Sequence, residues 1–142
     1  MALFSGLNIS ASGLTAQRTR MDTISNNIAN VNTTRTEEGG PYRRKMPVFA
    51  SRLKEEMGNI NNQKQKTGGG VEISEIRESS QQPKLRYKPN HPDADENGYV
   101  RMPNINIVSE MTDMMSASRA YEANVTAIDT SKQMAKSALQ IG

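Results

Sequence analysis

An acidic segment that ends in glycine comes closest, in residue types and spacing, to a site for chemistry. Residues 93–98, DADENG, place oxygen-bearing side chains at positions one, three and five and glycine at position six, as a calcium-binding EF-hand loop does. The match ends at position twelve, where Asn104 replaces the expected glutamate, and helices are not expected on both sides. Acidic turns ending in Asn-Gly are common because both residues tolerate positive φ. The segment therefore favours a turn over a calcium site.

Other features of catalytic or cofactor sites are lacking. A Ser-His-Asp triad would have to use His91, the single histidine, which we interpret as a turn-capping residue between Asn90 and Pro92. The three glycines at 68–70 lack the Gly-Lys-Ser/Thr of a phosphate-binding P-loop. The absence of cysteine excludes disulfides and thiolate metal sites. We therefore predict that the protein is not an enzyme and has no cofactor and no metal site.

The composition argues against a compact globular core. Of 142 residues, 35% are hydrophobic and 4% are aromatic, with no tryptophan. A soluble domain usually carries about 45–50% apolar residues, counting glycine. The core must therefore be thin, or completed by neighbouring subunits.

The charge pattern does not indicate a nucleic-acid-binding surface. The net charge is +3, with 18 basic residues interleaved among 15 acidic ones. The densest basic cluster is residues 43–45, with Arg52 and Lys54 nearby, and we interpret it as a solvated charged strand or loop. No apolar run approaches the roughly 20 residues of a membrane span. The N-terminus also lacks the pattern of a cleaved secretory signal. We expect no nucleic-acid partner and no direct membrane insertion.

Apolar residues at intervals of seven predict a long helix over about residues 3–31. Leu7, Leu14, Met21 and Ile28 form the repeat, and Ile24 lies on the same stripe. A strict seven-residue repeat corresponds to 3.5 residues per turn, as in a coiled coil, rather than to the 3.6 residues per turn of an isolated helix. Asparagine and threonine residues between positions 30 and 34 supply the predicted helix stop.

A second long helix is predicted over about residues 104–139, beginning near Ser109 and Glu110. The seven-residue repeat here consists of Ile107, Met114, Tyr121, Ile128 and Ala135. Met111, Val125 and Leu139 join this stripe, and Met111, Met114, Met115 and Met134 are interpreted as side chains that fill core gaps. At about 1.5 Å per residue, each helix is roughly 40–50 Å long and buries its stripe only against another helix.

The central region has the composition of strands and loops. It holds all the prolines, and alternation predicts a strand at 71–76 and a weaker one at 85–88. Residues 54–70 are polar and predict a mobile loop. We therefore predict a mainly α fold, in which two axial helices (1–35 and 104–142) pair as an antiparallel coiled-coil-like hairpin. A small β-rich middle domain (36–103) separates them.

Several segments resemble the bacterial flagellar rod and hook axial proteins. Residues 21–34, MDTISNNIANVNTT, resemble the N-terminal signature of that family, and residues 115–124 and 127–134 resemble its terminal helix. Residues 39–45, 70–76 and 90–100 resemble a proximal-rod member in particular. The resemblance covers nearly the whole chain.

The resemblance implies a structural subunit that polymerises through its terminal helices into the axial drive shaft of the basal body. It implies export through the flagellar type III apparatus without a cleaved signal peptide. The implied partners are other copies of the chain, other rod proteins and that export apparatus. The expected assembly interface comprises Leu7, Leu14, Met21, Ile24, Asn26, Asn27, Ile28, Asn30, Met111, Met114, Tyr121, Val125, Ile128 and Leu139.

The sequence allows other interpretations of three asparagines and of the whole chain. Asn26, Asn27 and Asn30 either form a local helix stop or make hydrogen bonds between subunits. The whole chain could instead be a cytoplasmic helical adaptor or chaperone that binds amphipathic helices, or a basic nucleic-acid module using Arg43, Arg44 and Lys45. Because two paired helices leave part of each exposed, we expect poorly ordered ends in the free monomer.

Overall fold

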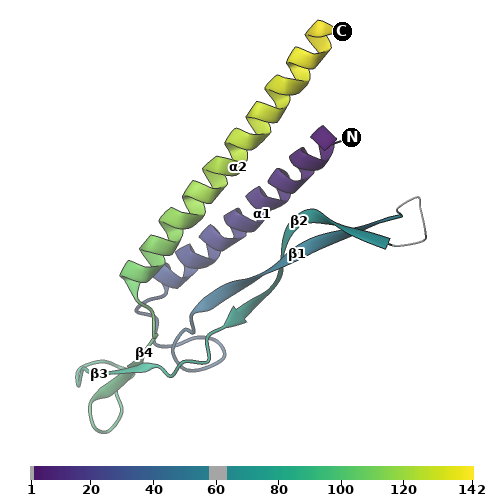
Figure 1. Cartoon of the computed structure of the whole chain (residues 1–142). Coiled ribbons are helices and arrows are strands. Elements are labelled where there is room, and N and C mark those ends of the chain that lie inside the picture. Colours follow the sequence, from purple (N-terminus) through teal and green to yellow (C-terminus); the bar gives the residue numbers. More distant parts are fainter. Residues whose placement is uncertain (1, 58–63) are drawn as a thin grey trace.

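The two long helices of the chain lie side by side, with both termini at the same end (Figure 1). The computed structural model describes residues 2–57 and 64–142. The elements are α1 (Ala2–Ala29), β1 (Lys45–Met57), β2 (Lys64–Glu78), β3 (Lys84–Tyr87), β4 (Tyr99–Met102) and α2 (Ile107–Ile141). The β1–β2 ribbon runs along α1, and the β3–β4 unit lies beyond the other end of the helices (Figure 1). The predicted mainly helical fold with a small β insert is confirmed.

The contacts between α1 and α2 join later residues of α1 to earlier residues of α2. Asn124 lies against Gly13, Asp113 pairs with Arg20, and Glu110 bonds to Asn27. The first helix is therefore antiparallel to the second.

Side-chain caps set the ends of both helices at the base of the pair. Asn106 Oδ1 accepts hydrogen bonds from the backbone N–H groups of Val108 and Ser109, so α2 begins two residues before the predicted Ser109. Helix α1 ends at Ala29, next to the predicted polar stop. The Asn30 amide donates to the carbonyl of Asn26 within the last turn.

The ribbon of β1 and β2 is longer than expected. Strand β1 continues to Met57 and β2 begins at Lys64, so the prediction of a mobile loop over 54–70 is wrong for 54–57 and 64–70. Residues 58–63 lie outside the described part of the chain. The predicted strand at 71–76 is confirmed within β2. The prediction failed because the paired residues in this part of the ribbon are mainly lysine, glutamate, glutamine and threonine, and the strand propensity of such residues depends on their structural context.

The ribbon is attached to α1 by a close backbone contact. The Val71 N–H donates to Ser12 Oγ at 3.0 Å. Gly70 has a φ of +105°, and a Cβ built on it would lie 2.2 Å from Ser12 Oγ. Only glycine allows this approach without displacing the ribbon.

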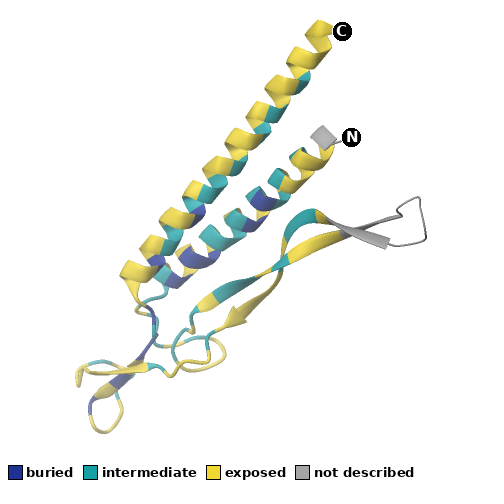
Figure 2. Cartoon of the chain, viewed as in Figure 1, coloured by how far each residue is buried: buried dark blue, intermediate teal, exposed yellow. Residues whose placement is uncertain are grey.

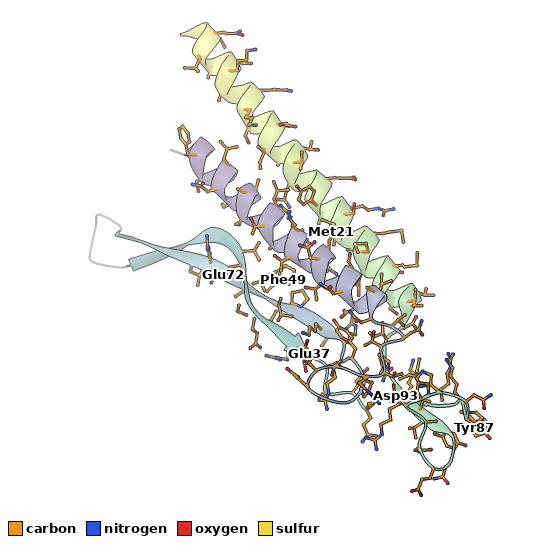
Figure 3. All side chains as sticks on the ribbon, turned by 180° about the vertical axis from the view of Figure 1, so that it is seen from behind. Met21, Glu37, Phe49, Glu72, Tyr87 and Asp93 are labelled. Carbon is orange, nitrogen blue, oxygen red and sulfur yellow. The ribbon has the colours of Figure 1, made fainter. Side chains whose placement is uncertain are left out.

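The β3–β4 unit forms a small separate cluster. Val100 is fully buried there, and Met102 and Ile105 are nearly so. The rings of Tyr87 and Tyr99 pack edge to face at 5.4 Å. Figure 3 shows Tyr87 and Asp93 on this unit, away from the free ends of the helices. The weaker predicted strand at 85–88 is confirmed for residues 85–87.

Candidate assembly surfaces and the buried polar junction

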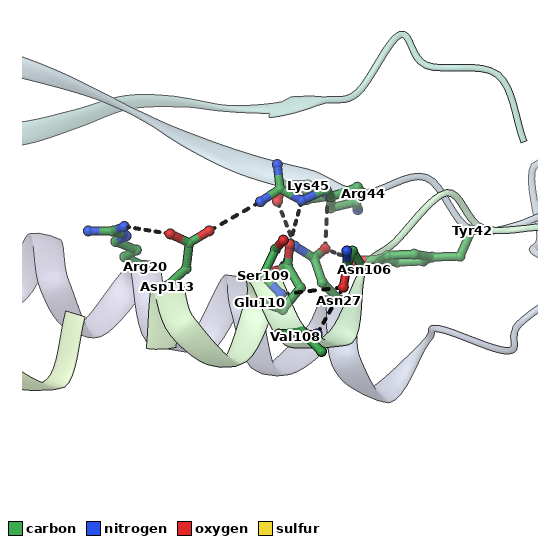
Figure 4. A network of polar contacts seen from close by, with 10 residues as sticks. All are labelled: Arg20, Asn27, Tyr42, Arg44, Lys45, Asn106, Val108, Ser109, Glu110 and Asp113. Carbon is green, nitrogen blue, oxygen red and sulfur yellow. Dashed lines mark hydrogen bonds and ion pairs between the residues drawn. The ribbon is translucent and has the colours of Figure 1, made fainter. Parts of the chain in front are cut away.

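A cluster of polar side chains closes the base of the helix pair (Figure 4). Asn27 of α1 and Glu110 of α2 are each 1% exposed, and the Asn27 amide donates to Glu110 Oε2 at 3.0 Å. The same amide donates to the Lys45 carbonyl at 2.8 Å, and Asn27 Oδ1 accepts from the Lys45 N–H at 2.9 Å. Asn27 therefore joins α1, β1 and α2.

Charged partners surround this pair. Arg44 Nε lies 2.5 Å from Glu110 Oε1, and Arg44 also reaches Asp113 at 3.5 Å. Arg20 pairs with the other oxygen of Asp113 at 3.4 Å. Two guanidinium groups thus meet two carboxylates, and their formal charges cancel. We call Arg20, Asn27, Tyr42, Arg44, Glu110 and Asp113 the polar junction.

Tyr42 completes the junction from the loop before β1. Its hydroxyl donates to Asn27 Oδ1 at 3.1 Å. Burial raises the pKa of Tyr42, and the nearby carboxylates of Glu78 and Glu110 raise it further. The phenol therefore remains a neutral donor at physiological pH.

The junction changes the interpretation of the three asparagines. Asn26 and Asn30 donate to the carbonyls of Asp22 and Asn26, which is the local helix-end role. Asn27 is instead buried within the chain, so its amide is not available to a neighbouring subunit. Sequence reasoning missed Glu110 and Arg44 as its partners. One signal was present, because Glu110 lies three residues after Ile107 and four before Met114, within the predicted apolar stripe.

The predicted apolar interface residues divide into two groups. On α1, Ile24 is buried, and four others are half-buried: Leu7, Leu14, Met21 and Ile28. On α2, Met114, Tyr121 and Ile128 are half-buried and share a face with buried Ala117. Figure 2 shows buried residues on α1 and near the base of α2, with the far part of α2 largely exposed.

The remaining three residues, Met111, Val125 and Leu139, do not contribute to the core of the chain. Met111 is 56% exposed and lies off the face that Met114, Tyr121 and Ile128 share with Ala117, and Leu139 is 82% exposed at the free end of α2. The prediction that Met111, Met115 and Met134 fill the core is therefore wrong for the isolated chain.

The outer face of α2 carries an apolar patch near its base. Val108, Met111 and Met115 are 73%, 56% and 57% exposed. Their spacing of three and four residues puts them on one side of the helix, turned away from Glu110 and Ala117. We call these three residues the outer patch, and sequence reasoning included only Met111 in the interface.

The acidic segment is a turn, as the sequence favoured. Asp95 Oδ1 accepts the backbone N–H groups of Asn97 and Tyr99, and Gly98 has a φ of +80°. His91 Nδ1 accepts the Asp93 N–H, which confirms the turn-capping role. Across the described ranges, no group of three potential metal-ligating side chains occurs.

Asp93 ties this turn to the loop that follows α1. Its carboxylate accepts from the Thr34 hydroxyl at 2.7 Å and pairs with Arg35 at 2.5 Å. The hydrogen bond from Thr34, followed by the charge of Arg35, lowers the pKa of Asp93.

The basic cluster is largely paired with acidic groups. Arg44 belongs to the polar junction, Lys45 lies 3.8 Å from Glu78, and Arg52 lies 3.0 Å from Glu72. Three basic side chains of the cluster therefore face carboxylates, which fits the interleaved charges of the sequence. Within residues 2–57 and 64–142, neither long helix is apolar enough to span a membrane.

Two family models match the two ends of the chain. Residues 7–35 match the family model "Flagella basal body rod protein", and residues 96–141 match "Flagellar basal body rod FlgEFG protein C-terminal". These ranges correspond to most of α1, and to β4 with α2.

Full-length relatives extend the match over the middle of the chain. The flagellar basal-body rod protein FlgC of Borreliella burgdorferi is 49% identical over 99% of this chain and 98% of its own length. FlgC of Bacillus subtilis is 45% identical over 100% of this chain and 99% of its own, and FlgC of Escherichia coli is 39% identical over the same shares. These relatives confirm the predicted structural, non-enzymatic class. The chain belongs to the FlgC family of flagellar basal-body rod proteins.

Proposed function

We propose that this structural subunit of the flagellar basal-body rod joins its neighbours through the exposed faces of its two terminal helices. The inner faces pair in a coiled-coil-like way, and the outer faces receive helices of adjacent copies and of other rod proteins. In this division, residues 1–35 and 104–142 are the axial segments, and 36–103 is a middle domain that contacts adjacent subunits.

The observation that carries the proposal is the unusual exposure of apolar side chains on α2. The outer patch is exposed over more than half of each of its side chains. Leu139 and Ile141, at the free end, are 82% and 88% exposed. Clustered apolar surface of this kind is characteristic of protein interfaces, because burying it removes the area from water.

The arrangement also supports an open assembly. A contact between different surfaces of successive copies does not close on itself and produces a helical polymer. The outer patch lies on α2, whereas the ribbon covers a separate face of α1 (Figure 1). Distinct exposed surfaces on the two sides support a head-to-tail contact.

The test replaces the outer patch with polar residues. Val108→Ser, Met111→Ser and Met115→Ser together should leave the isolated chain folded, because these side chains make little of its core. We expect loss of swarming and loss of the subunit from purified basal bodies. Met134→Ser is a matched control, because Met134 is 55% exposed but lies outside the outer patch. Normal rods and full motility in the triple variant would contradict the proposal.

The membership of the family supports delivery through the flagellar type III apparatus, which we propose as the route to the rod. Fractionation of intact cells tests both the route and the location. The chain should co-purify with basal bodies and should remain in the cytoplasm when the export gate is deleted. A purely cytosolic protein in wild-type cells would favour the helical adaptor.

A further inference from the structure

The inner faces of the two helices are both built on a seven-residue spacing. On α1 the positions turned toward α2 include Gly13, Arg20 and Asn27. On α2 they include Glu110, Ala117, Asn124 and Ser131, all buried or half-buried. In the observed register Gly13 lies against Asn124, and Asn27 bonds to Glu110.

Such a repeat does not by itself define one register. A slip of α2 by seven residues, or about 10.5 Å, would bring Ser131 opposite Gly13 and Ala117 opposite Asn27. The half-buried repeats of Leu14, Met21 and Ile28 on α1 and Met114, Tyr121 and Ile128 on α2 would again meet apolar residues. Small and apolar side chains therefore accept both registers.

The polar junction does not accept the slip. Glu110 is 1% exposed, and its carboxylate is bonded on one oxygen by Arg44 and on the other by Asn27. A slip would separate Glu110 from both donors and leave Asn27 opposite an alanine. A buried carboxylate without partners is strongly unfavourable, whereas a paired one is tolerated.

We infer that the Arg44–Glu110–Asn27 contact sets the register between α1 and α2. It selects one of several heptad-related alignments and thereby fixes which α2 side chains face outward at each height along α1. Arg44 and Glu110 are positioning residues in this sense, since they act by excluding the slipped alignment rather than by adding apolar contact.

Disulfide trapping in the full-length chain tests the inference directly, because the native chain has no cysteine. The native register is reported by Gly13→Cys with Asn124→Cys, because a Cβ on Gly13 would lie 3.0 Å from Asn124 Cγ. The slipped register is reported by Gly13→Cys with Ser131→Cys and Asn124→Ala, because a Cβ on Gly13 would otherwise clash with Asn124 and disfavour the native register. In the wild-type background we expect the native disulfide to form at least about tenfold faster than the slipped one.

The polar contacts of Glu110 with Arg44 and Asn27 are then removed by Arg44→Met with Glu110→Leu. Replacing both partners by apolar residues preserves burial, so helix content should be retained while the two disulfides form at about equal rates. The matched control is Arg52→Met with Glu72→Leu, an Arg–Glu pair at 3.0 Å on the exposed ribbon, which should keep the wild-type preference.

A retained tenfold preference in the double variant would overturn the inference and assign the register to the loop before α2. If the double variant does not fold, Glu110→Gln decides the question. It keeps the shape and removes the charge, so the slipped disulfide must form faster than in the wild type. An unchanged ratio in Glu110→Gln also overturns the inference.

Discussion

Gly13 of α1 lies directly against the side chain of Asn124 of α2, so that a Cβ on Gly13 would stand 2.8 Å from Asn124 Oδ1. The Asn124 amide donates to the Ala120 carbonyl, which holds the side chain over the glycine. The helices therefore approach closely where one lacks a side chain.

This contact predicts that the effect of Gly13→Ala on the free energy of unfolding depends on the residue at position 124. Gly13→Ala gains about 1 kcal/mol of helix propensity, but the clash with Asn124 should cancel that gain. In the Asn124→Ala background the clash is absent, so Gly13→Ala should stabilise the chain by about 1 kcal/mol. Urea unfolding followed by circular dichroism measures the difference. Equal effects in both backgrounds would show that the contact does not constrain the helices.

The approach of the ribbon to α1 gives a second prediction. Gly70→Ala combines an unfavourable positive φ with a clash against Ser12 Oγ and should cost more than about 2 kcal/mol. Gly39 has a φ of +85° with open space around it, so Gly39→Ala should cost only about 1–2 kcal/mol. Comparing the two by urea unfolding isolates the clash. Similar losses would show that the ribbon adjusts freely.

Asp93 predicts a dependence of stability on acid pH. Because its pKa in the folded chain lies below the ordinary value of about 3.9, its contribution is present above that value and is lost as the pH falls through the folded pKa. Thr34→Val should move the pKa of Asp93 upward, since the Thr34 hydroxyl donates to its carboxylate. A carbon-detected NMR titration measures this shift. Thr33→Val is the control, because that hydroxyl donates to Asn30 and not to Asp93.

The distribution of buried residues predicts that, in the free monomer, the helices are well ordered near the polar junction and less ordered at their free ends. We expect the slowest amide exchange near the polar junction, at residues 20–27 and 110–117, where both helices are tied to β1. Exchange should be fastest at residues 2–8 and 130–141, where the described side chains are mostly exposed. Hydrogen-exchange mass spectrometry on the monomer reports both regions. Full protection throughout residues 5–30 and 110–138 would exclude poorly ordered ends.

The sequence alone determined the two long helices, the β-containing middle and the family resemblance. Leu7, Leu14, Met21 and Ile28 have the helical spacing that any amphipathic helix must have, and this local pattern survives in α1. The turn at Asp95 was likewise predictable, because its hydrogen bonds involve residues within four positions.

The tertiary structure alone decided which face of α2 is paired and what closes the base of the hairpin. Met111 is apolar yet exposed, whereas Glu110 is charged yet 1% exposed. The spacing within one helix cannot reveal this choice, because Glu110 is buried only where Arg44 and Asn27, 66 and 83 residues away, supply its partners. Burial of a charge depends on the groups brought to it by the whole fold, and those groups are set by long-range contacts.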